Sequence, residues 1–230
     1  MMISEKVQQL KDDLDNVYSK GSSDGYKLGQ NEMKNQIEYS ITYGGKRTHY
    51  YGAFARQDWS GYSFTTPITP KDNAENMFFT YYGTTLPSGI DCSQLTGSVA
   101  TMFRYSQKIT DINDMNIQAP TEYKLTFANI PNLKKIEVVR CNENTKFTNT
   151  FQNDTALTDV TFEGVIGQNG LDLKASPNLS KASLLSILNC LQDKSGDNSA
   201  TWTITIGNSN LGKLTAEEIE SAEEKGWVIV

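Results

Sequence analysis

The single histidine of the chain, His49, is the first candidate for catalytic chemistry, because an imidazole can act as a general base near neutral pH. It lies in the segment Thr48–Tyr51, with no serine or cysteine nucleophile motif beside it. The alternative is a glutamate or lysine that acts as the general base, but no motif in the sequence points to one. The sequence therefore favours a packing or turn role for His49, and we expect no enzymatic activity.

Two stretches resemble ligand-binding loops but lack residues that such loops need. Gly44–Thr48 reads GGKRT, yet Ser40 stands where a phosphate-binding loop has its first glycine. Asp193–Ser199 has alternate oxygen side chains, as at the start of a calcium loop, but the sixth place is not glycine and the twelfth is Ile204. The cysteines form no close pair; they are Cys92, Cys141 and Cys190. We expect neither a cofactor nor a metal.

A cluster of aromatic residues could form a binding site in which their rings stack on sugar rings. Its members are Tyr50, Tyr51, Trp59 and Tyr62. Used in this way they would make a glycan binder or a glycan-active enzyme. The alternative, which we favour, is that these rings pack together in the cap of a larger structure.

The composition of the chain limits the kinds of partner that it can bind. The formal net charge is −6 and the pI about 4.9, with no basic cluster larger than the pairs Lys46–Arg47 and Lys134–Lys135, so binding to nucleic acid is disfavoured. No apolar run is long enough to span a membrane, so we expect no membrane insertion. Residues 1–20 lack the apolar core of a signal peptide, which predicts synthesis in the cytoplasm without Sec export.

Large apolar residues recur at a constant spacing in the middle of the chain, where each anchor lies 24 positions after its counterpart. They occupy three places in each of three copies: Phe103, Phe127 and Phe151; Ile109, Leu133 and Leu157; Ile112, Ile136 and Val160. A degraded fourth copy has Leu173 and Leu179. A period of this length with this core is typical of leucine-rich repeats. Each unit would supply a short strand and a return, stacked in a solenoid; the alternative is a meander of similar hairpins.

The N-terminal part of the chain, 1–40, reads as a helical, coiled-coil segment. Within it, the stretch 4–18 carries apolar side chains at 3-4-3 spacing, namely Val7, Leu10, Leu14 and Val17. A flexible joint follows at Lys20–Gly25. This seam predicts a homo-oligomer such as a trimer, and the alternative is a helix docked on its own domain.

The rest of the chain divides into three parts. Residues 41–100 form an aromatic-rich cap and a worn first repeat, in which Phe79 lies 24 positions before Phe103. Residues 101–179 hold the repeats, and residues 180–230 predict an α/β cap with helices capped at Ser180 and Thr215. The predicted fold class is thus an α/β solenoid between two caps.

Residues that alternate with the anchors would form an exposed contact face. They are Lys135, Glu137, Asp159, Thr161 and Glu163. Polar residues of mixed charge suit a weak or multivalent contact. The alternative is that they are merely solvated.

The repeat pattern resembles the BspA-like leucine-rich-repeat family. Four segments of the C-terminal part, Ile166–Gly170, Leu179–Ile187, Thr205–Thr215 and Lys225–Trp227, are similar, more narrowly, to the ends of repeat proteins encoded by phages and prophages of gut Firmicutes. The earlier segment Gly45–Phe78 is also similar to a segment of that group.

This resemblance implies a non-enzymatic virion structural protein of a tail, baseplate or fibre, or of a head-decoration fibre. Its partners would be copies of itself, other virion proteins, and a host surface glycan or protein. The competing interpretation is a bacterial cell-surface adhesin of the same repeat family, which predicts a signal peptide or a wall anchor.

Overall fold

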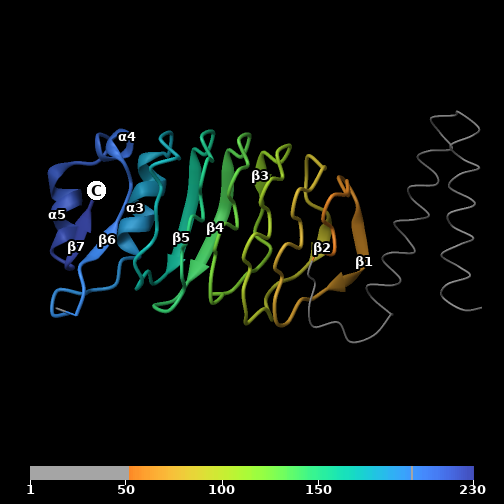
Figure 1. Cartoon of the computed structure of the whole chain (residues 1–230), viewed down its shortest axis with the longest axis horizontal. Helices are drawn as coiled ribbons and strands as arrows, with labels where there is room; N and C mark the ends of the chain where they lie inside the picture. Colours follow the sequence, from red (N-terminus) through yellow and green to blue (C-terminus); the bar gives the residue numbers. More distant parts are fainter. Residues whose placement is uncertain (1–51, 198) are drawn as a thin grey trace, which may run out of the picture. The chain divides into compact units, whose positions relative to one another are not determined.

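The computed structural model describes residues 52–197 and 199–230, without the side chains of Thr65 and Thr66. The predicted oligomerisation residues Val7, Leu10, Leu14 and Val17, together with His49, Tyr50 and Tyr51, lie outside the described residues. Figure 1 shows the elements in chain order: β1 (Ser63–Ile68), β2 (Ser88–Ile90), β3 (Asp111–Ile112), β4 (Lys135–Cys141), β5 (Asp159–Gly164), α3 (Lys181–Asn189), β6 (Trp202–Ile204), α4 (Asn208–Leu211), α5 (Ala216–Glu223) and β7 (Trp227–Ile229).

The strands pair in parallel, and their register follows the spacing of the anchors. In the sheet β3–β4–β5, Ile112 pairs with Ile136 and Ile136 pairs with Val160, so each anchor lies beside its counterpart in the next copy. A parallel step of this length requires the chain to leave one strand and return beside it. We call one such strand with its return a coil, and Figure 1 shows the coils of β3, β4 and β5 side by side.

The return of each coil contains a segment that we call the turn ladder, where two residues four apart have positive φ. These pairs are Gly52 and Arg56, Asn76 and Thr80, Thr101 and Tyr105, Leu125 and Asn129, and Asn149 and Asn153. Between them the N–H groups alternate in direction. The Phe127 N–H donates to the backbone carbonyl of Thr150 in the next coil at 3.1 Å, whereas the Ala128 N–H donates to the backbone carbonyl of Leu125 in its own coil at 3.3 Å. Hydrogen bonds between coils thus offset the cost of the left-handed conformation.

A column of phenylalanine rings runs through the core beside the turn ladder. Phe54, Phe78, Phe103, Phe127 and Phe151 lie with successive ring centroids 4.9, 5.4, 5.8 and 5.5 Å apart. Each ring is at most 2% exposed. The other six anchors, Ile109, Ile112, Leu133, Ile136, Leu157 and Val160, are at most 5% exposed. Burying side chains of this size contributes about 1.5–3 kcal/mol each.

The worn first repeat is displaced by one place from its predicted alignment. Phe78, not Phe79, stacks on Phe103, with 5° between the two ring planes. Phe79 is only half-buried and meets Tyr105 edge-on. The prediction for Phe79 was wrong because the step from Phe78 to Phe103 is one place longer than the later steps, so a constant period selects the neighbouring ring.

The helix α3 occupies the place beside β5 where a further strand would pair. Ser183 and Ser186 accept hydrogen bonds from the N–H groups of Val160 and Phe162 at 2.9 and 3.2 Å. The helix begins at Ser180, whose side chain accepts from the Ser183 N–H, as the sequence predicted. The sheet therefore ends at hydroxyl groups instead of an open strand edge.

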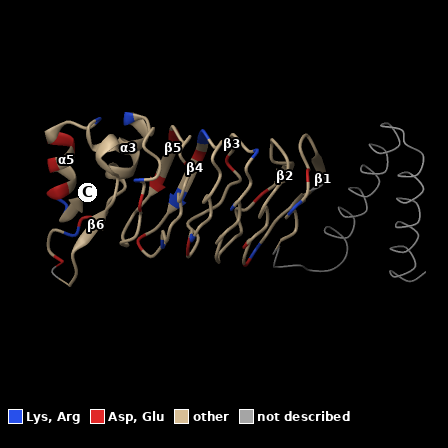
Figure 2. Cartoon of the chain, turned by 45° about the horizontal axis from the view of Figure 1, so that its top comes forward, with Lys and Arg blue, Asp and Glu red and all other residues tan. Residues whose placement is uncertain are grey.

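Beyond α3 the chain adds the parallel pair β6–β7 and two short helices. The capping box of Thr215 and Glu218 is confirmed at the start of α5. Trp227 of β7 is buried, and its indole Nε1 donates to the Gln192 carbonyl at 2.7 Å. Figure 2 shows acidic residues along α5, which keeps this end of the described region strongly polar.

Candidate functional site

The exposed side chains of β3, β4 and β5 form a surface that we call the strand face. Its predicted members, Lys135, Glu137, Asp159, Thr161 and Glu163, are all exposed. They alternate with the buried side chains of Ile136 and Val160, as a half-buried parallel sheet requires. In register across the three strands lie Asp111, Lys135 and Asp159, a row of alternating charge. Charged residues on β4 and β5 are visible in Figure 2.

Arg140 of β4 joins three coils on the strand face. Its two terminal nitrogens donate to the two carboxylate oxygens of Asp114 at 2.9 and 2.7 Å, and its Nε donates to Glu163 at 3.0 Å. A two-point pair of this kind fixes orientation as well as charge. The hydrogen bonds from Arg140 lower the pKa of Asp114, and the carboxylates raise the pKa of Arg140 above its usual range.

The spacing of the anchors does not indicate Arg140, because β4 contains an irregularity. Between Ile136 and Val139 the register shifts, so three steps on β4 match two on β5, where Val160 and Phe162 are the partners. Such a bulge reverses the inward and outward alternation beyond it. The signal that could have found the site is the acidic pair Asp114 and Glu163, which lie one coil before and one coil after Arg140.

Further hydrogen bonds connect polar groups on the strand face and beside it. Glu137 accepts the backbone N–H of Asp114 at 2.9 Å. The Asn116 side chain donates to Asp91 at 3.0 Å, one coil earlier, and Ser93 also donates to Asp91. The hydrogen bond from the Ser93 backbone N–H, with those from the Asn116 and Ser93 side chains, lowers the pKa of Asp91. Polar groups already in place lose little side-chain entropy when they meet a partner.

The strand face presents charged groups of both signs. On the three strands its carboxylates are Asp111, Glu137, Asp159 and Glu163, and its cations are Lys135 and Arg140. Asp91, Asp114 and Lys134 lie beside the strands. In the described part of the chain, no group of three or more His, Cys, Asp or Glu side chains is arranged to hold a metal ion. The excess of carboxylates suits a partner with basic groups.

The aromatic cluster is placed differently from a sugar-stacking site. Trp59 is fully buried, with its ring 5.4 Å from Phe54 and 5.6 Å from Phe64, so its faces are not available to a ligand. Tyr62 is half-buried and meets Trp59 edge-on at 5.0 Å. Stacking of a glycan on Trp59 is therefore corrected to core packing, which was the favoured alternative.

Two polar hollows interrupt the surface on the return side of the coils. One, of about 320 Å³, lies between the turn ladder and β6 and is lined by Thr148, Asn149, Asn169, Gly170, Leu171, Asp172, Thr203 and Thr205. The other, of about 420 Å³, is lined by Thr96, Ala119, Thr121, Glu122, Asn142, Asn144 and Lys146. The anchor spacing gives no signal for either hollow.

Among the described residues, none of the helices has the length and apolar content needed to cross a membrane.

Comparison with known proteins finds no relative. No protein-family model matches the chain, and neither a curated protein nor a solved structure shows significant similarity to it.

Proposed function

We propose that the chain is a non-enzymatic structural protein of a phage particle, part of a tail, baseplate or fibre or of a head-decoration fibre. Its stacked coils, in which equivalent anchors of successive copies are strand partners, support a solenoid of leucine-rich repeats. The C-terminal segments that resemble phage-encoded repeat proteins support the particle assignment. In this proposal the protein acts in the virion after synthesis in the host cytoplasm.

The observation that carries a contact function is the Asp114–Arg140–Glu163 network. It orders side chains from three coils on one exposed surface. A fixed array of both charge signs selects partners by complementarity and disfavours the wrong ones. Its partner is a neighbouring subunit or a host surface protein, and several copies on one particle strengthen a weak single contact through avidity.

The proposal includes a homo-oligomer joined through Val7, Leu10, Leu14 and Val17. A two-heptad seam needs partner helices to be stable in water. The test is native mass spectrometry of the full chain and of the double variant Leu10→Ser/Leu14→Ser. We expect an oligomer for the first and a monomer for the second; monomers in both would refute the seam.

The strand face is tested by reversing charge without changing the backbone. Particles that carry Lys135→Glu together with Glu163→Lys would adsorb to host cells, or assemble, at least about tenfold less well, since like charges facing across a contact cost several kcal/mol. The matched control is Glu223→Lys on the exposed surface of α5. Equal adsorption and assembly of both variants would mean that the strand face is only solvated.

A bacterial surface adhesin is the second candidate, favoured by the same exposed strand face. The two candidates differ in where the chain resides. An adhesin would be recovered with the cell envelope, whereas a virion protein would be recovered with purified particles.

A further inference from the structure

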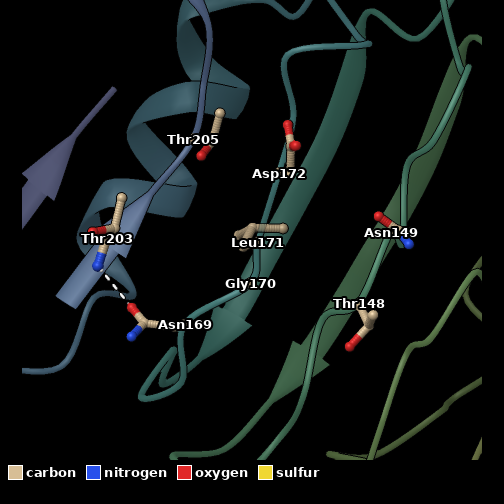
Figure 3. Close-up of a pocket in the computed structure, with 8 residues that line it drawn as sticks. All are labelled: Thr148, Asn149, Asn169, Gly170, Leu171, Asp172, Thr203 and Thr205. Atoms are coloured by element: carbon tan, nitrogen blue, oxygen red, sulfur yellow. Dashed lines mark hydrogen bonds between the residues drawn. The ribbon is translucent and has the colours of Figure 1, made fainter. Parts of the chain in front are cut away.

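The hollow between the turn ladder and β6 has the shape of a small binding site. Figure 3 shows Thr148 and Asn149 on one side, Thr203 and Thr205 on the other, and the segment Asn169–Asp172 between them. Its volume is about 320 Å³, at the lower end of the range for small-ligand pockets. Leu171, which is 2% exposed, contributes to its lining.

Gly170 explains why the surface is hollowed at this point. Lys146 pairs with Glu122, which lies 24 positions earlier. Gly170 stands 24 positions after Lys146 in the sequence. Gly170 has φ of 106°, and a Cβ there would lie 3.2 Å from the Phe147 carbonyl oxygen. A residue without a side chain is therefore required by the backbone, and the row of side chains is interrupted there.

The walls of the hollow keep hydrogen-bonding groups free for a ligand. Within the described part of the chain, the side chains of Thr148, Asn149, Thr203 and Thr205 form no hydrogen bond with other residues. By contrast, the amide of Asn169 is fixed: it accepts from the Thr203 N–H at 2.7 Å and donates to the Thr201 carbonyl at 3.0 Å. Figure 3 shows the first of these bonds.

The charge of the hollow favours a neutral ligand. Asp172 is its one ionisable lining residue, and the Lys174 ammonium lies 3.0 Å from that carboxylate. The free groups are hydroxyls and an amide, which both donate and accept hydrogen bonds. The threonine methyl groups add apolar surface. A sugar ring has alternating C–H and O–H groups on its surface, so it can match both the polar and the apolar groups of this lining.

We propose that this hollow binds one uncharged sugar residue of a glycan, with Thr148, Asn149, Thr203 and Thr205 contacting its hydroxyls. The site lies on the return side of the coils, apart from the strand face, so it does not depend on the contact proposed there. It gives the protein a glycan-binding function in which the buried Trp59 takes no part.

The test is titration of the full chain, labelled with ¹⁵N, with methyl glycosides of glucose, galactose, mannose and N-acetylglucosamine, followed by NMR. Sodium sulfate serves as the anionic probe. We expect at least one glycoside to shift the amide signals of Gly170 and Leu171 saturably, with a millimolar Kd. The double variant Thr203→Val/Thr205→Val should weaken that binding at least about tenfold, because it removes two hydroxyl partners and keeps the side-chain shape.

The control variant is Thr155→Val, an exposed threonine outside the hollow. It should bind the glycoside like the unaltered chain, and the NMR spectra of both variants report whether they are folded. The proposal is overturned if none of the glycosides binds, if the double variant binds equally well, or if sulfate alone shifts the same amides. None of these outcomes bears on the strand face, because no variant alters it.

Discussion

The hydroxyl of Ser183 accepts a hydrogen bond from the backbone N–H of Val160 at 2.9 Å, so a helix side chain closes the edge of the β3–β4–β5 sheet. Ser186 does the same for Phe162 at 3.2 Å. An open edge strand is a template for pairing with another chain. The two serines provide the protection that a further strand would otherwise give.

Replacing Ser183 with alanine leaves the Val160 N–H buried without an acceptor. We expect the free energy of unfolding to fall by about 1–3 kcal/mol, measured by urea denaturation. Ser183→Thr should retain most of the stability because it keeps the hydroxyl. The control is Ser221→Ala on the exposed side of α5, where alanine is the better helix former. A loss of equal size in Ser221→Ala would refute the edge-capping role.

Phe78 and Phe79 differ in their contribution to stability although they are neighbours. Phe78→Ala removes a ring from between Phe54 and Phe103, and the resulting cavity should cost about 3–5 kcal/mol. Phe79→Ala, at a half-buried position, should cost clearly less. Thermal or urea denaturation of both variants makes the comparison. If Phe79→Ala is the more damaging, then the constant-period alignment is right and the observed register is wrong.

Asp154 makes stability depend on pH. Its side chain is fully buried, Oδ1 accepts the Ile130 N–H at 2.9 Å, and Oδ2 has no partner in the described structure. Burial raises the pKa of Asp154 from 3.8 to about 8. The folded state then holds a proton that the unfolded state releases between these values, so the contribution is fully present below about pH 4 and lost as pH rises through about 8.

The measurement for Asp154 is the free energy of unfolding from pH 4 to pH 8. Relative to Asp154→Asn, the unaltered chain should lose stability with a slope approaching about 1.4 kcal/mol per pH unit in that window. Asparagine keeps an acceptor for the Ile130 N–H and does not ionise. Parallel curves for the two proteins would contradict the buried, protonated carboxyl.

Arg140 controls the ionisation of Asp114. Because hydrogen bonds from Arg140 lower the pKa of Asp114, Arg140→Gln should raise that pKa toward its ordinary value, as followed by NMR titration of the carboxyl carbon. The stability contribution of this lowered pKa is present at neutral pH and is lost as pH falls through the pKa of the folded state. Lys108→Gln, an exposed change outside the Asp114–Arg140–Glu163 network, should leave the titration of Asp114 unaltered.

Side-chain spacing predicted the parts of this structure that repeat. Phe103, Phe127 and Phe151 occupy equivalent core positions because a regular coil returns the chain to the same height after a constant number of steps. The turn ladder was not predictable in the same way. Thr101, Tyr105 and Leu125 have positive φ, which their residue types disfavour, and only hydrogen bonds to the adjacent coils make that conformation favourable.

The sequence did not indicate Arg140 on the strand face or the hollow beside β6, because both depend on local irregularities of the coils. Arg140 reaches the strand face because of the bulge after Ile136, and a bulge depends on the pairing with β5 and not on β4 alone. The hollow combines Gly170 with Thr203, which is more than one regular coil farther along the chain. Non-local packing of this kind leaves no periodic trace in the sequence.

The most direct test of the account is to ask whether the chain is part of a phage particle. Particles purified from cells that carry the gene would be analysed by mass spectrometry and by electron cryomicroscopy. We expect stoichiometric amounts of the chain and exterior density that fits the stacked coils of residues 52–197 and 199–230. Absence from the particles, with the chain recovered in the cell envelope, would contradict it and favour the adhesin.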